Sequence, residues 1–210
     1  LACAPAAILA GVALWLGSLP LCLLAAAAAG WLVGPALTCL YDTILRALRD
    51  EPGFWWHTYK RVWKQSFKSS LVPGIVFTLL WVLVAYAAFV LPQMTTVPAG
   101  FALVLVVDMV LLLTLGSYYW MQNALFDAPV SKKLSNCVRM LLGFLPRTAL
   151  SAVFQLGYWL LMAVVIPRCA FIFLLTGLWL PNLLATLAVY APVEKSLHLE
   201  EQIRAKRESD

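Results

Sequence analysis

Two long apolar runs enclose the basic, aromatic stretch Phe54-Trp55-Trp56-His57-Thr58-Tyr59-Lys60-Arg61-Val62-Trp63-Lys64-Gln65-Ser66-Phe67-Lys68. In a helix over about 54–70, four aromatic side chains share one face and three lysines share another. These are Trp56, Tyr59, Trp63 and Phe67, and Lys60, Lys64 and Lys68. Aromatic rings favour headgroup depth and lysines favour anionic lipid, so the pattern predicts an interfacial helix. The alternative, a core helix of a soluble bundle, fits poorly with an apolar run on each side.

Composition indicates an integral membrane protein. Of the 210 residues, 63% are hydrophobic and 12% are charged, which is too little polar surface to cover a water-soluble globule. The formal charge of +5 would suit nucleic acid, but the basic residues adjoin the apolar runs, where topology and anionic lipid explain them better. The five cysteines include no C-x-x-C pair and predict no disulfide framework.

The apolar runs predict an all-α transmembrane bundle with six spans. No charged residue occurs between Leu1 and Tyr41, about twice the roughly 20 residues that cross a bilayer. Two helices fit this length best, and a single crossing gives the alternative of five spans. The expected spans cover about 1–16, 19–41, 71–91, 100–125, 148–166 and 169–190. Together they form one domain over 1–192, followed by a charged tail over 193–210.

Charge orients the predicted spans. Every Lys and Arg except Arg168 lies in one of three places: the loop between the second and third spans, the loop between the fourth and fifth, or the tail. The positive-inside rule puts these three segments in the cytoplasm. We therefore expect a cytoplasmic face built from amphipathic interfacial helices.

One part of the sequence resembles a known family. The resemblance rests on the motif Gly34-Pro35-Ala36-Leu37-Thr38-Cys39-Leu40-Tyr41-Asp42, on Arg46, Asp50-Glu51 and Phe54, and on the run Trp63-Lys64-Gln65-Ser66-Phe67-Lys68-Ser69-Ser70-Leu71. In these features the chain is similar to the YesL-like family of small bacterial multi-pass membrane proteins of uncharacterised activity, most strongly over about 19–75. The resemblance implies a bacterial inner-membrane protein from a family often encoded beside carbohydrate uptake and breakdown genes. It implies no catalytic residue.

Three polar residues inside the predicted spans form a candidate intramembrane site. Asp108 lies about a dozen ångströms into the fourth span, a costly position that usually faces a cavity or a partner. Gln155 in the fifth span and Asn182 in the sixth could join it around a proton, a cation or a solute. Two alternatives stay open: Asp108 is a protonated or snorkelling acid, and the amides form interhelical hydrogen bonds that hold the bundle together.

Helix breaks are predicted at two places. Gly34 and Pro35 lie in the second span, and Pro181 lies in the sixth. Proline lacks the amide hydrogen of the helical ladder, so a kink or break is expected near each. Discontinuous helices of this kind line the binding sites of transporters.

The sequence lacks motifs for catalysis and metal binding. His57 and His198 are far apart in sequence, and neither lies in an H-x-x-x-H or H-E-x-x-H pattern. No G-x-S-x-G, Walker or G-x-G-x-x-G motif occurs. Ser117 or Ser151 with Asp108 would supply a nucleophile and a base for a membrane hydrolase, but no motif supports that pairing. We expect no enzyme activity, no metal and no cofactor.

Three function classes remain open, and the third of them, a membrane enzyme, would require a clustered nucleophile and base. An accessory or scaffold protein would use the helix over 54–70 to bind anionic headgroups and a membrane or cytoplasmic protein, such as the sugar-uptake system that the resemblance implies. A small transporter or channel would use the polar site around Asp108, and so short a chain would need to form a homo-oligomer around a conventional pore. We favour the accessory protein.

Overall fold

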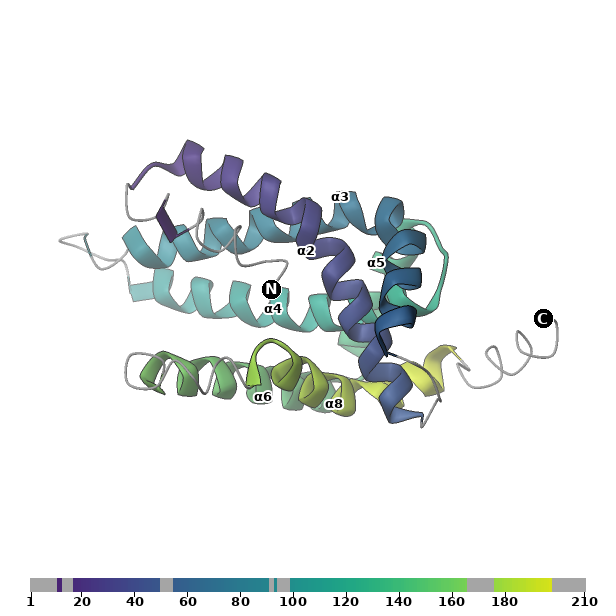
Figure 1. Ribbon diagram of the computed structural model, residues 1–210. Coiled ribbons are helices and arrows are strands. Elements are labelled where there is room, and N and C mark those ends of the chain that lie inside the picture. The colour runs from purple at the N-terminus through teal and green to yellow at the C-terminus, as the bar shows by residue number, and fades with distance from the viewer. Residues whose placement is uncertain are drawn as a thin grey trace, which may run out of the picture. The chain divides into compact units, whose positions relative to one another are not determined.

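A computed structural model describes residues 11–12, 17–49, 55–90, 93, 99–165 and 176–197. These residues are almost entirely helical and include no strand, which confirms the all-α expectation for this part of the chain. The helices (Figure 1) are α2 (Leu19–Leu48), α3 (Trp55–Val90), α4 (Ala99–Leu125), α5 (Val130–Gly143), α6 (Leu145–Val165) and α8 (Trp179–Leu197). The predicted first span over 1–16, apart from residues 11 and 12, and tail residues 198–210 lie outside the described part.

The chain divides into two compact units. The first comprises Leu1–Leu112 and Asn123–Asp127, and the second comprises Leu113–Gln122 and Ala128–Asp210. Helix α4 contributes to both units, because its middle turns belong to the second.

In the first unit, α2 and α3 run antiparallel and their backbones touch at three glycines. A Cβ atom on Gly74 would lie 2.6 Å from both the Gly34 Cα and the Gly30 carbonyl oxygen. Thr78 donates a hydrogen bond from its Oγ1 to the Ala26 carbonyl oxygen, at 2.9 Å. Small side chains allow such close approach where lipid provides no hydrophobic drive between helices. We call this contact the glycine seam.

The break predicted at Gly34 and Pro35 does not occur. Helix α2 continues through both residues for its full 30 residues, although its ribbon changes direction part-way along (Figure 1). A proline removes one backbone hydrogen bond and bends a helix, but ending the helix would leave more polar groups unsatisfied in an apolar setting. Helix α2 is therefore continuous where the sequence predicted a kink or break.

Helix α3 joins two segments that the sequence treated separately. The predicted interfacial helix over 54–70 and the predicted span over 71–91 form one helix of 36 residues with Pro73 inside it. Figure 1 shows this helix bent, with its first part (dark blue) running across the direction of the rest. The first part thus has a direction of its own within one continuous helix, which lacks one backbone hydrogen bond at Pro73.

Three helices of the described residues are long and apolar enough to cross a membrane. They are α2, α3 and α4, and a fourth crossing is added if α5 and α6 together form one broken span. This agrees with a membrane protein of several spans. The count of six and the cytoplasmic position of the amphipathic helices stay predictions.

In the second unit, α5 and α6 meet at a bend of 99° near Phe144. Helix α6 agrees with the predicted span over 148–166, but the span predicted over 169–190 is not one continuous helix. A turn at Gly177 and Leu178 precedes α8, and Gly177 has a φ of 47°, which favours glycine. Pro181 therefore lies in the first turn of α8, where its missing amide hydrogen costs little.

Helix α8 also extends beyond the predicted membrane domain. It runs to Leu197, and Val193, which was assigned to the charged tail, is buried. The start of the predicted tail is thus part of the packed second unit.

Candidate functional site

The first part of α3 carries the predicted aromatic and basic faces. Its four rings stack in sequence: Trp56 on Tyr59 with ring centroids 6.2 Å apart, Tyr59 on Trp63 at 5.9 Å, and Trp63 against Phe67 at 6.4 Å. Lys60 holds its Nζ 5.0 Å from the centroid of the Trp56 ring, a cation–π contact. We call these four aromatic residues, with Lys60, Lys64 and Lys68, the aromatic–lysine face.

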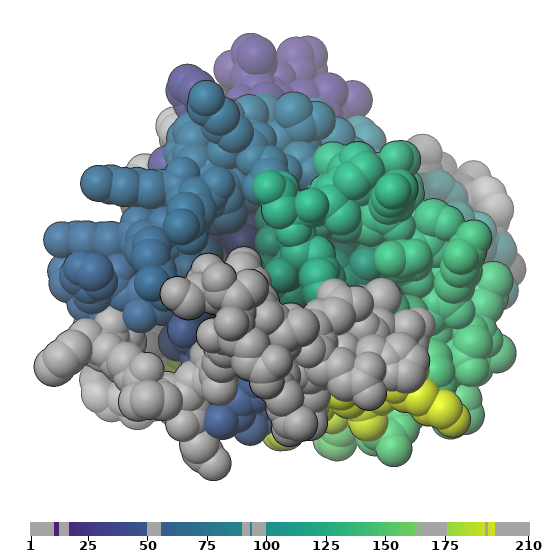
Figure 2. Space-filling model, turned by 90° about the vertical axis from the view of Figure 1, so that its right-hand side faces the viewer, coloured from purple at the N-terminus to yellow at the C-terminus, as the bar shows by residue number. Residues whose placement is uncertain are grey.

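A buried row on another side of α3 leaves the aromatic–lysine face at the surface. Val62, Ser66 and Ser70 recur every fourth residue, are buried, and continue the row that ends in Gly74 at the glycine seam. The three lysines are exposed one helical turn apart, so their charges lie along one line about 12 Å long. Figure 2 shows long side chains projecting from the blue part of the surface, where α3 begins. A line of ammonium groups beside stacked rings is suited to phosphate groups at an apolar boundary.

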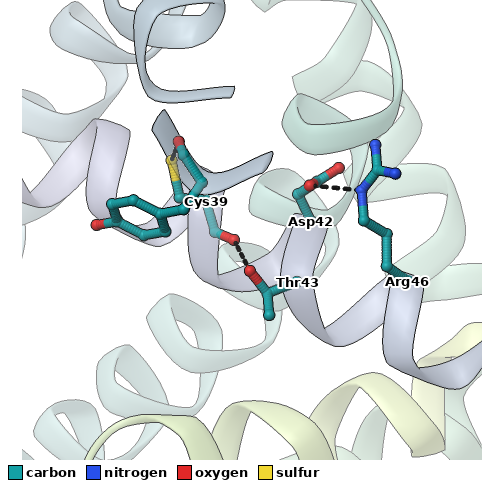
Figure 3. A network of polar contacts seen from close by, with 5 residues as sticks. Cys39, Asp42, Thr43 and Arg46 are labelled. Carbon is teal, nitrogen blue, oxygen red and sulfur yellow. Dashed lines mark hydrogen bonds and ion pairs between the residues drawn. The ribbon is translucent and has the colours of Figure 1, made fainter. Parts of the chain in front are cut away.

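A polar network at the end of α2 ties that helix to the aromatic–lysine face (Figure 3). Cys39 donates from its Sγ to the Tyr59 carbonyl oxygen at 3.7 Å, a weak contact, and Thr43 donates to the Cys39 carbonyl oxygen at 2.8 Å. One turn further on, the Arg46 Nε donates to the Asp42 Oδ2 at 2.9 Å in a half-exposed ion pair. The backbone that carries Tyr59 is therefore held against α2.

A second polar contact links α2 to the end of α4 inside the first unit. The Asn123 Nδ2 donates to the Thr38 Oγ1 at 2.9 Å, and that hydroxyl donates to the Gly34 carbonyl oxygen at 3.0 Å. Both side chains are buried. The motif Gly34-Pro35-Ala36-Leu37-Thr38 thus combines a bend, a seam contact and an interhelical hydrogen bond.

Gln155, one of the predicted intramembrane residues, lies in a buried hydrogen-bonded cluster of the second unit. Its Nε2 donates to the Ser117 Oγ at 3.0 Å and to the Ser151 Oγ at 3.4 Å, and the Ser117 hydroxyl donates to the Leu113 carbonyl oxygen at 2.8 Å. The amide is 3% exposed. This arrangement joins α4 to α6, as expected of an interhelical hydrogen bond.

The three predicted intramembrane residues are divided between the two units. Asp108 is half-buried on the part of α4 that belongs to the first unit, whereas Gln155 and Asn182 belong to the second. Asn182 donates from its Nδ2 to the Leu178 carbonyl oxygen at 2.6 Å, within the turn that begins α8. The polar site around Asp108 stays a prediction.

Sequence reasoning missed the roles of several other polar residues. Asn123 and Gln122 lie at the end of the predicted fourth span: the Asn123 Nδ2 donates to the Thr38 Oγ1, and the Gln122 Nε2 lies 3.2 Å from the Cys137 Sγ. Ser117 and Ser151, considered as nucleophiles beside Asp108, both contact Gln155 instead. The spacing of polar residues at i and i+4 could have identified the polar face of each helix. It could not have identified which of these faces contact one another.

Within the described residues, no three side chains of His, Cys, Asp or Glu are grouped so that they could hold a metal ion. The aromatic–lysine face offers cationic side chains.

Comparison with known proteins matches one part of the chain. Residues 12–88 match the family described as "Protein of unknown function, DUF624", the family to which YesL belongs. The match includes α2 and nearly all of α3, and it covers the region of the resemblance seen in the sequence. No curated protein and no solved structure matches the chain.

Proposed function

We propose that the protein is an accessory or scaffold protein of the bacterial inner membrane, of the YesL-like kind, without enzymatic activity. Its aromatic–lysine face lies at the cytoplasmic surface, where it binds anionic headgroups and a protein partner. The partner class that the resemblance implies is a sugar-uptake system. The long loops and the C-terminus are cytoplasmic in this proposal, and six spans cross the membrane.

The observation that carries the proposal is the form of the aromatic–lysine face. Three of its rings are stacked and the fourth, Phe67, is tilted against Trp63. Its lysines recur at regular intervals on the helix that continues into the apolar part of α3. The Cys39 contact and the buried row of Val62, Ser66 and Ser70 fix this surface on α2. A surface already ordered in this way loses little side-chain entropy on binding.

Lipid titration tests the first half of the proposal. Each lysine near an anionic surface contributes about 1 kcal/mol, so replacing all three should weaken binding of phosphatidylglycerol roughly 100-fold. We expect phosphatidylglycerol to raise the Tm of the wild-type protein in neutral detergent more than phosphatidylcholine does. The K60Q/K64Q/K68Q variant should lose this difference, and K60R/K64R/K68R should keep it. Equal lipid dependence of the wild type and the glutamine variant would contradict the proposal.

Uptake measurements test the second half. In cells that carry the charge-reversed variant K60E/K64E/K68E, sugar uptake should fall to the level of cells without the protein, whereas Asp108→Asn should leave it unchanged. Immunoblotting of membranes checks that both variants are inserted equally. If Asp108→Asn abolished sugar uptake and K60E/K64E/K68E left it unchanged, transport through a polar site would be favoured.

A small transporter or channel is the second candidate function. The buried cluster of Gln155, Ser117 and Ser151 places three polar side chains among apolar helices, and Asp108 adds a carboxyl group in an apolar part of α4. Flux of protons or monovalent cations into proteoliposomes tests this function. A flux that both Asp108→Asn and Gln155→Leu abolish would support transport, and a flux no greater than that of empty liposomes would exclude it for these ions.

A further inference from the structure

Helix α5 exposes a continuous row of aliphatic side chains. Val130, Leu134, Val138 and Leu142 recur every fourth residue and are 46%, 50%, 44% and 62% exposed. Four residues advance a helix by a little more than one turn, so these side chains form a single stripe along all 14 residues of the helix. A stripe of this size on a basic helix is expected to have an apolar surface opposite it.

The other two faces of α5 differ sharply from this stripe. Lys133, Cys137 and Met140 are buried, and Cys137 lies beside Gln122 of α4. Exposed polar residues, including Lys132, Ser135 and Arg139, occupy the third face. At 100° per residue, the centre of each face lies about a third of a turn from the next. The helix therefore has one buried face, one exposed apolar face and one exposed polar face.

The orientation of α5 relative to α6 supplies an independent observation. The two helices meet at 99°. Helix α6 has 21 residues, about 31 Å of helix, and contains most of the span that the sequence predicts over 148–166. Its own outward side chains are apolar, as Val153, Leu160 and Val164 are 64%, 69% and 59% exposed. A helix perpendicular to such a span lies in the plane of the membrane.

Exposed leucines also lie on both sides of the bend between α5 and α6. Leu142 near the end of α5 and Leu145 at the start of α6 are both exposed, at 62% and 56%, on either side of the bend. Arg147 is exposed just beyond them. Lipid around the bend would therefore meet exposed leucines of both helices, and Arg147 lies two residues beyond Leu145.

We propose that α5 is a second interfacial helix, bound to the bilayer by its aliphatic stripe, and that it does not form a broken span or a re-entrant loop with α6. The stripe contacts acyl chains just below the headgroups, Lys132 and Arg139 face the anionic headgroups and water, and the buried face attaches the helix to the bundle. This inference requires that α6 crosses the membrane, but it is independent of the partner and lipid roles proposed for α3.

Depth of immersion distinguishes the arrangements. In an interfacial helix the whole stripe lies at one level, about 5–10 Å into the headgroup and acyl boundary. In a re-entrant helix or a broken span, the rise of about 1.5 Å per residue would make one end of the stripe up to about 18 Å deeper than the other.

Spin labelling in bilayers measures this depth. Single cysteines are placed at Val130, Leu134, Val138 and Leu142, at Ser135 and Arg139 on the polar face, and at Val153 as a deep reference, in a chain whose five native cysteines are replaced. The variants are reconstituted in phosphatidylethanolamine and phosphatidylglycerol, and collisions with oxygen and with a water-soluble nickel complex are compared. We expect labels at the four stripe positions to collide more often with oxygen than with the nickel complex, and to report the same shallow depth. Labels at the two polar positions should collide more often with the nickel complex.

Three results would overturn the inference. A steady change in depth from Val130 to Leu142 would indicate a re-entrant helix, and equal nickel access on both faces would indicate a helix in water. Low access to both reagents on the stripe would indicate a protein partner or a second copy of the chain. If the cysteine-free chain does not fold, benzoylphenylalanine at Leu134 or at Ser135 in the native chain replaces the labels. Lipid cross-linking should then be several-fold stronger at Leu134, and equal yields would overturn the inference.

Discussion

Substituting alanine for Gly74 tests the glycine seam with the smallest available change. The new methyl carbon would lie 2.6 Å from the Gly34 Cα and from the Gly30 carbonyl oxygen, compared with an ordinary separation of 3.5–4.0 Å. Both neighbours are backbone atoms, so no flexible side chain can move away. The helices must separate by about 1 Å, which also weakens the contact between Thr78 and the Ala26 carbonyl oxygen.

The expected loss follows from two opposing effects. Overpacking typically costs about 1–3 kcal/mol, and alanine regains about 0.5–1 kcal/mol over glycine inside a helix. We expect a net loss of about 1–2 kcal/mol, which lowers the ratio of folded to unfolded protein about 5- to 30-fold. Reversible unfolding in mixed SDS and lipid micelles, followed by tryptophan fluorescence, measures this difference.

Gly157→Ala is the matched control. Gly157 is exposed in α6 and has no atom within 4 Å of the position of an added Cβ, so the same substitution should be neutral or slightly stabilising. If Gly74→Ala proves as stable as Gly157→Ala, the helices do not approach as closely as the structure shows, and the reasoning fails.

Two further predictions concern the second unit. Gln155→Leu removes the contacts to Ser117 and Ser151, so it should destabilise the protein by about 0.6 kcal/mol, and by less than about 2 kcal/mol. The control, Gln65→Leu on the exposed surface of α3, should have no such effect in the same unfolding assay. The Cys137 thiol is fully buried, so peptide mass spectrometry should find it modified by maleimide much more slowly in the folded protein than in SDS. Rapid labelling of the folded protein would show that α5 detaches from the bundle.

Features that depend on local periodicity could be predicted from the sequence. The aromatic–lysine face follows from spacings of three and four residues, and in a helix such residues necessarily share a side. The all-α class follows from long apolar runs, because only helices satisfy their own backbone groups in lipid.

Features that depend on pairing between helices could not be predicted. Asn123 contacts Thr38 over 85 residues of sequence, and Gln155 contacts Ser117 over 38. Each of these polar residues has the right spacing on its own helix, but hydropathy does not specify which helices meet. The turn before α8 also depends on a contact with another helix, because Tyr158 of α6 donates a hydrogen bond to the Gly177 carbonyl oxygen at 2.6 Å.

The glycine seam also has a mechanical consequence. Gly34 is followed by Pro35, and Gly74 is preceded by Pro73, so the two prolines flank the point where α2 and α3 touch. Each helix lacks one backbone hydrogen bond at about the same level, which is where bending costs least. Bending at both prolines would form a double hinge. Any swing of the aromatic–lysine face must turn both helices at once, so α2 and α3 beyond the seam act as a single two-helix arm.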